Sequence, residues 1–139
     1  EAVRGSQLPN LRFLGRLSFD ETVSQVERCH VGLCLRMDDE VSKDAFPVKV
    51  WEYLGLGLPS VVTPHCEAGA FLERHGCGFQ LPAGNVDAII EVLLQLRSEA
   101  NERESMSANC RSAAGRFTRE RLGAEAALLI TNDWNPRSS

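Results

Sequence analysis

The sequence predicts an α/β fold in which a parallel sheet carries helices on both faces. Short apolar runs alternate with segments of helical periodicity, in the order strand, helix, strand, helix, strand, helix, strand and then further helices. The apolar runs are nearly continuous, as expected for strands that are buried on both faces. A length of 139 residues fits a single domain.

The composition excludes several classes of protein. Hydrophobic residues make up 43% of the chain, enough for a sizeable core, and the net charge of -4 argues against a nucleic-acid-binding surface. The apolar runs are far shorter than the ~18 residues of a membrane-spanning helix. The five cysteines lack the paired spacing of zinc sites or disulfide scaffolds, which predicts free thiols, no metal site and a cytoplasmic location.

The first third of the chain begins with a polar connector at residues 1–9, from which we expect the chain to be part of a longer protein. Leu11–Leu14 has the pattern of a short strand. Ser18 and Glu21 have the spacing of a capping box, which predicts that a helix begins there. The apolar run Val31–Leu35 predicts a buried strand, followed by a polar loop to Ala45.

The middle of the chain contains the most informative segment. Pro47 is a residue suited to the start of a helix, which we expect to end near Leu56. Gly57 suits the left-handed position after a helix, and Pro59 prevents continuation.

The later elements follow from the same rules of periodicity and capping. They are a strand at Ser60–Thr63, a helix at Ala68–Arg74, a strand at Phe79–Leu81, a helix capped by Asn85, a helix through Met106 and Phe117, and a final helix capped by Thr118. We expect residues 132–139 to be a frayed tail.

Ligands of parallel α/β sheets bind outside the carboxyl ends of the strands, which directs attention to the loops before the Pro47 helix and after Thr63. The helix is apolar except for Lys49 and Glu52, which lie on one stripe. A cation in the first helical turn, together with unpaired helix N–H groups, is typical of a phosphate site. A carboxylate one turn further on is suited to the two hydroxyls of a ribose. The alternative is a simple Lys49–Glu52 surface pair, and periodicity does not decide between the two.

The segment from Asp44 to Glu52 resembles the Glu-x7-Glu motif of GT-B glycosyltransferases of the family 4 type (group 1), with Asp at the first position. The continuation to Val62 is similar to the Glu-x-x-Ala-x-Gly-x-Pro-Val-Val run of that family. The flanking elements follow the family's order, so that the resemblance covers nearly the whole chain. It implies a Rossmann-like sheet that is the C-terminal half of a GT-B fold, incomplete at its N-terminus. Residues 1–139 would then form a partial nucleotide-sugar-binding domain.

The resemblance also implies roles for single residues. Asp44 would contact hydroxyls of the transferred sugar, and Lys49 would hold the diphosphate of the donor. Glu52 would bind the ribose diol. Phe46, Pro47 and Val48 would form the loop that approaches the sugar and the phosphate. Arg36 and Met37 are candidates to line the pocket of the base. The upstream Arg and Lys that clamp the phosphates in the family are not visible here, and no catalytic residue is assigned.

The implied function is transfer of a sugar from a nucleotide-diphosphate sugar to an acceptor, as in bacterial polysaccharide or glycan synthesis. It requires no cofactor and no metal, and the chain alone is expected to be inactive. The implied partners are the nucleotide sugar and an N-terminal acceptor domain of the same enzyme, through which the protein could associate with a membrane. Two alternatives stay open: a non-catalytic nucleotide-binding domain, and a sugar-nucleotide epimerase with the same architecture.

Overall fold

The computed structural model describes residues 8–44 and 46–133. Its centre is a three-stranded sheet of β1 (Gly32–Leu35), β2 (Ser60–Thr63) and β3 (Gly78–Gln80), in the spatial order β1-β2-β3. Both neighbouring pairs are parallel, with Leu33 opposite Val61 and Val61 opposite Phe79. The predicted α/β class and parallel sheet are confirmed.

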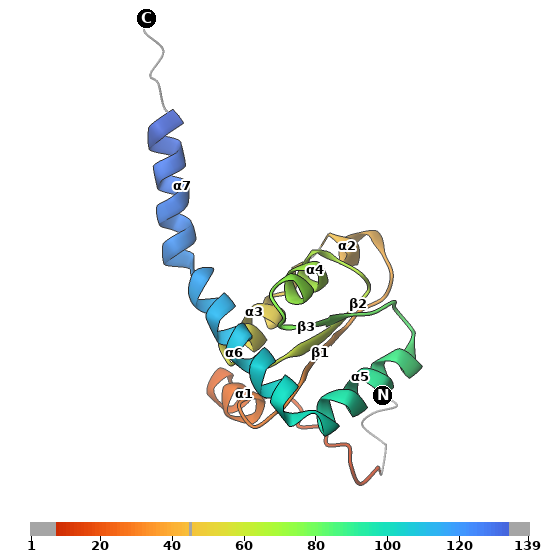
Figure 1. Cartoon of the computed structure of the whole chain (residues 1–139). Coiled ribbons are helices and arrows are strands. Elements are labelled where there is room, and N and C mark those ends of the chain that lie inside the picture. Colours follow the sequence, from red (N-terminus) through yellow and green to blue (C-terminus); the bar gives the residue numbers. More distant parts are fainter. Residues whose placement is uncertain (1–7, 45, 134–139) are drawn as a thin grey trace, which may run out of the picture.

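Seven helices accompany the sheet among the described residues (Figure 1). They are α1 (Phe19–Val26), α2 (Glu40–Lys43), α3 (Val48–Gly55), α4 (Glu67–Arg74), α5 (Val86–Ser98), α6 (Ala100–Arg116) and α7 (Arg119–Asp133). The sheet separates α3 and α4 from α5, so that helices lie on both faces (Figure 1). The helix α7 projects away from the rest of the molecule (Figure 1).

Local signals in the sequence explain where several helices begin and end. The Ser18 backbone N–H donates to Glu21 Oε2 at 2.8 Å, and the Glu21 N–H donates to Ser18 Oγ at 3.4 Å, which completes the predicted capping box of α1. Asn85 Oδ1 accepts the Ala88 N–H at 3.1 Å at the start of α5. Gly57 has a φ of 71°, the left-handed conformation predicted for the end of α3.

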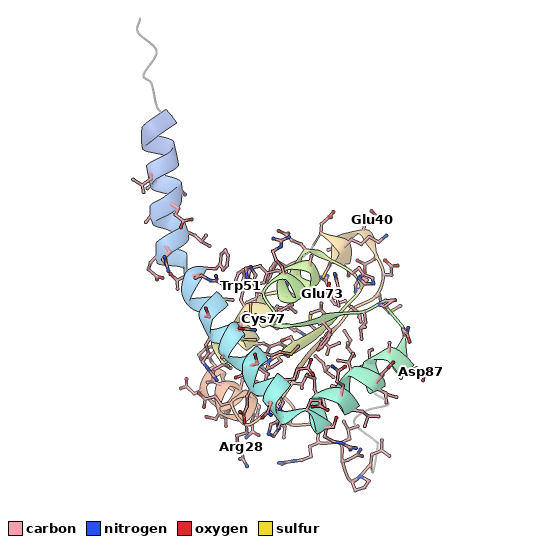
Figure 2. The ribbon with its side chains drawn as sticks, in the orientation of Figure 1. Arg28, Glu40, Trp51, Glu73, Cys77 and Asp87 are labelled. Atoms are coloured by element: carbon pink, nitrogen blue, oxygen red, sulfur yellow. The ribbon has the colours of Figure 1, made fainter. Side chains whose placement is uncertain are left out.

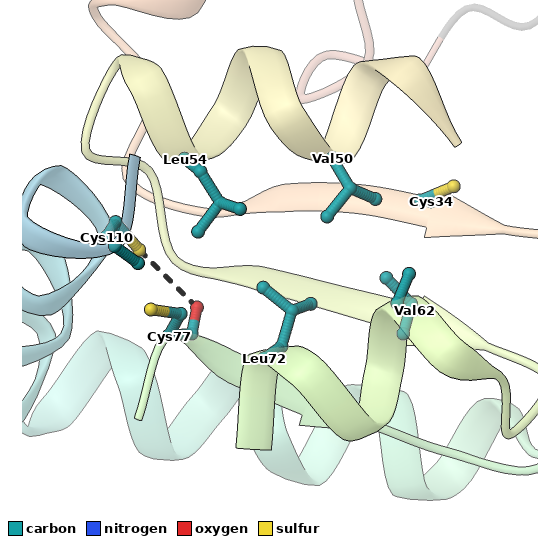
Figure 3. Packing of buried hydrophobic residues seen from close by; sticks show 9 residues of the cluster. Cys34, Val50, Leu54, Val62, Leu72, Cys77 and Cys110 are labelled. Carbon is teal, nitrogen blue, oxygen red and sulfur yellow. Dashed lines mark hydrogen bonds between the residues drawn. The ribbon is translucent and has the colours of Figure 1, made fainter. Parts of the chain in front are cut away.

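The main core lies between the sheet and the helices α3, α4 and α6 (Figure 3). Val50 and Leu54 of α3, Leu72 of α4 and Val62 of β2 are almost fully buried there. Cys110 of α6 closes one end of this core, and its Sγ donates to the Cys77 carbonyl oxygen at 3.6 Å (Figure 3). Packing of α3 against both β1 and α6 fixes the orientation of the helix that carries Lys49 and Glu52.

Two predictions about strands are wrong. Leu11–Leu14 forms no strand, and its leucines are 43% and 44% exposed. A strand needs a hydrogen-bonding neighbour, and within the described residues β1 is the edge of the sheet with no strand beyond it. The strand β1 is also buried on one face only, because Leu33 and Leu35 are 39% and 48% exposed. By contrast, all four residues of β2 are buried, as expected for the central strand.

The helix α7 ends at Asp133, and positions 134–139 of the predicted tail lie outside the described residues. Within residues 8–44 and 46–133, no helix combines the length and the apolar character needed to cross a bilayer.

Candidate functional site

The N-terminus of α3 lies at the carboxyl edge of the sheet, where ligands of parallel α/β folds bind. Pro47 precedes the first helical residue and provides no side-chain hydrogen bond to the helix end. The N–H groups of Val48 and Lys49 belong to the first turn, where no acceptor within the helix is available to them. The end of α3 therefore offers backbone donors next to a positively charged side chain.

Lys49 and Glu52 are both exposed and lie about 4.5 Å apart along the axis of α3 (three residues at about 1.5 Å each). Within the described part of the chain, neither side chain forms a salt bridge. The simple surface pair that the sequence left open is thus not formed. Both charges remain available to a ligand that extends along the helix.

An aromatic cluster holds the loop that leads into α3. The Phe46 ring stacks on the Trp51 ring with centroids 4.5 Å apart and meets the Phe71 ring edge-on at 5.5 Å. The ring of Trp51, labelled in Figure 2, also faces the ring of Phe117, the C-cap residue of α6, with centroids 6.2 Å apart. These contacts occupy the side chain of Phe46, so only its backbone is left for a ligand. Trp51 is partly buried and packs against the core.

Asp44 lies at the C-terminal end of α2 and is exposed. The neighbouring Lys43 forms salt bridges at 3.5 Å with Asp38 and with Glu40. In the described residues Asp44 has no salt bridge, and the structure shows no contact that would bring it to Lys49 or Glu52.

A cavity of about 330 Å³, which was not predicted from the sequence, opens between α1 and α3. Glu52 and Tyr53 lie on its α3 side, and its other lining residues are mostly apolar. These are Leu17, Phe19, Thr22, Val23, Val26, Gly55 and Leu56. Neither Arg36 nor Met37, the two candidates for a base pocket, lines this cavity. It could not be found from sequence because it depends on how two helices from separate parts of the chain pack together.

Tyr53 forms a fixed wall of this cavity. A β-carbon on Gly32 would lie 2.5 Å from Tyr53 Cδ2, so only glycine in β1 leaves room for the ring. The Tyr53 hydroxyl donates to the Leu33 carbonyl oxygen at 3.5 Å. Burial, with smaller contributions from Cys34 and Glu52, raises the pKa of Tyr53, so the hydroxyl stays protonated at neutral pH.

The described residues contain no group of three or more His, Cys, Asp or Glu side chains placed to bind a metal ion. All five cysteines are free thiols. At the N-terminus of α3, the backbone N–H groups of the first turn and the Lys49 side chain are suited to an anionic ligand.

Comparison with known proteins gives one positive result. The family model described as "Glycosyl transferases group 1" matches residues 6–113, which include α1, the sheet, α3 and most of α6. Searches of curated proteins and of solved structures found no match. Because the family model covers well over half of the chain, the chain belongs to the group 1 glycosyl transferases.

Proposed function

We propose that this chain binds the nucleotide-diphosphate-sugar donor of a group 1 glycosyl transferase along the exposed face of α3. The observation that carries the proposal is the linear arrangement of three features. Lys49 lies at the N-terminus of the helix, Glu52 one turn further on, and the apolar cavity at the end beyond Glu52. A nucleoside diphosphate presents an anion, a diol and an aromatic base in the same order.

Each part of the donor has a chemical counterpart. The diphosphate would accept hydrogen bonds from Lys49 and from the first-turn N–H groups of α3. The Glu52 carboxylate would accept the two ribose hydroxyls. The base would enter the cavity beside Tyr53, whose volume of about 330 Å³ is at the lower end of ligand pockets and suits a nucleoside.

The transferred sugar would lie beyond the diphosphate, near Asp44, the loop of Phe46 and Pro47, and Val48 at the start of α3. When the glycosidic bond to the diphosphate breaks, negative charge grows on the leaving phosphate. Lys49 and the helix N–H groups would stabilise that charge without a metal ion. No residue of this chain is assigned as a proton donor or nucleophile.

The proposed partner is an acceptor-binding domain of the same enzyme, and the proposed role is the synthesis of a glycan or polysaccharide. The five free thiols support a reducing, cytoplasmic setting, since oxidising compartments favour disulfides.

Isothermal titration of the chain with UDP-, GDP- and ADP-sugars tests the proposal. We expect Lys49→Ala to weaken binding by about 10-fold or more, because a charge-assisted hydrogen bond is lost. We expect Glu52→Gln to weaken binding to a similar degree with ribose nucleotides and not with 2′,3′-dideoxy nucleotides. Lys43→Ala is the matched control, since Lys43 is held by Asp38 and Glu40 and should leave affinity unchanged.

Absence of binding by any nucleotide sugar would overturn the proposal. Product analysis with the complete enzyme separates the remaining alternatives. A new glycosidic bond supports the transferase, a free epimerised nucleotide sugar indicates an epimerase, and binding without any product indicates a non-catalytic domain.

A further inference from the structure

Arg36 stands at the carboxyl end of β1, and its backbone is fixed by Thr63 of β2. The Arg36 N–H donates to the Thr63 carbonyl oxygen at 3.2 Å and to Thr63 Oγ1 at 3.0 Å. The Thr63 hydroxyl in turn donates to the Arg36 carbonyl oxygen at 3.0 Å. Thr63 is 2% exposed, so water does not compete for these bonds. The backbone position of Arg36 is therefore well defined.

The side chain of Arg36 starts on the same side of the sheet as α3. Residues alternate along a strand, and in β1 Gly32 and Cys34 face α3 while Leu33 and Leu35 face away. Arg36 continues the series of Gly32 and Cys34. Burial raises the pKa of the Cys34 thiol, and the positive charges of Lys49 and Arg36 both oppose that rise. Arg36 therefore follows β1 on the side of the sheet against which α3 packs.

The Arg36 side chain has no carboxylate within salt-bridge distance in residues 8–44 and 46–133. Asp39 is close enough for Arg36 to affect its pKa, but its Oδ1 already accepts the Ser42 N–H at 2.7 Å and caps α2. The guanidinium therefore keeps donors that an anionic ligand at this position could accept from.

We propose that Arg36 is a second cation of the donor site, which binds the diphosphate together with Lys49 and is positioned by Thr63. The inference rests on the proposed function. A nucleoside diphosphate carries more negative charge than one lysine neutralises, and a guanidinium can bond two phosphate oxygens at once. Arg36 thus takes the place of a second phosphate ligand, which the sequence left unassigned.

Titration of the chain with inorganic pyrophosphate, with UDP, GDP and ADP, and with the corresponding nucleosides tests the assignment. Arg36→Ala should weaken binding of pyrophosphate and the diphosphates by about 10-fold and leave nucleoside binding unchanged. Arg36→Lys should recover part of the loss. The matched control is Arg74→Ala, since Arg74 is exposed in the last turn of α4, at the opposite edge of the sheet.

Thr63 has a separate test. Thr63→Val keeps the shape of the side chain but removes the hydroxyl, and it should weaken diphosphate binding without affecting the nucleosides. Thr63→Ser should restore the affinity. A variant that only lost stability would weaken both classes of ligand.

The outcomes distinguish this inference from the function on which it rests. If the unmodified chain binds no diphosphate, both are overturned. If Lys49→Ala weakens diphosphate binding while Arg36→Ala stays within twofold of the unmodified chain, the donor site stands and the role of Arg36 is overturned.

Discussion

At the residue scale, Lys49 occupies a position that α3 itself disfavours. A cation in the first turn of a helix meets the positive end of the helix dipole, at a cost of roughly 0.3–1 kcal/mol. No side-chain cap and, in the described residues, no salt bridge offsets this cost. A bound diphosphate would offset it, since the anion interacts favourably with both the lysine and the helix end. This conflict is visible in the sequence, which is why Lys49 could be chosen without a structure.

Glu21 gives the cavity between α1 and α3 a predicted pH dependence. The Ser18 backbone N–H and hydroxyl both donate to its carboxylate, and these hydrogen bonds lower the pKa of Glu21 from its ordinary value of 4.5. Because the pKa is lowered in the folded state, these hydrogen bonds stabilise α1 at pH values above the ordinary pKa of Glu21. That contribution is lost as the pH falls through the lowered one. We expect α1, which carries Phe19 and Thr22, to loosen below about pH 4.5.

An NMR titration of the Glu21 carboxyl carbon checks this prediction. Ser18→Ala should move the Glu21 pKa part of the way back, because the hydroxyl donor is removed and the backbone donor remains. Glu21→Gln should remove the change in α1 amide exchange with pH. An unshifted pKa of Glu21 in the unmodified chain would show that the capping box does not persist in solution.

At the element scale, the sequence predicted best those features that depend on neighbouring residues. Ser18, Gly57 and Asn85 act on backbone groups within a few positions, and the structure confirms all three. The predicted strand at Leu11–Leu14 was wrong because strand pairing depends on a neighbour that is distant in the sequence. The predicted burial of β1 on both faces was wrong for the same reason. At the site, Lys49 and Glu52 were visible as charges on an apolar helix. The cavity and the position of Arg36 relative to α3 required the packing of separate elements.

The pairing of β2 with β3 requires a glycine at position 78. A β-carbon there would lie 1.9 Å from the Ser60 carbonyl oxygen, and this backbone atom cannot move aside as a flexible side chain can. We predict that Gly78→Ala lowers the free energy of unfolding by about 3 kcal/mol, the upper end of overpacking costs. Urea denaturation followed by circular dichroism measures this change.

Gly115→Ala in α6 is the matched control for that substitution. A β-carbon at Gly115 has no atom within 4 Å, and alanine is favoured over glycine inside a helix by about 0.5–1 kcal/mol. The control should therefore be neutral or stabilising. Equal stability of the Gly78→Ala and Gly115→Ala variants would contradict the close approach of the two strands.

At the scale of the whole molecule, the chain divides into a packed body and a projecting helix (Figure 1). The family match ends at residue 113, before α7 begins at Arg119. The body leaves the apolar side chains of Leu33 and Leu35 partly exposed at the edge of the sheet.

The projecting helix leads to a prediction about stability. In the described residues, α7 has few contacts with the other elements, and Leu122 and Leu128 are 44% and 62% exposed. A helix of 15 residues is only marginally stable in water without packing. We predict that removing residues 119–139 changes the free energy of unfolding by no more than about 0.5 kcal/mol, as for surface changes. The α7 amides should also exchange much faster than those of β2.

Ala113→Asp provides the contrast, because it places a charge in the fully buried contact of α6 with the core, at a cost of several kcal/mol. Urea denaturation of the unmodified chain, the truncated chain and the Ala113→Asp variant decides whether α7 projects or packs. If truncation lowers the free energy of unfolding by more than about 2 kcal/mol, as much as a core substitution does, α7 packs on the body in solution. Such packing would have to include Leu122, which lines a hollow of about 420 Å³ with Val48 and Trp51. Truncation would then also weaken nucleotide binding, whereas a projecting α7 leaves that affinity unchanged.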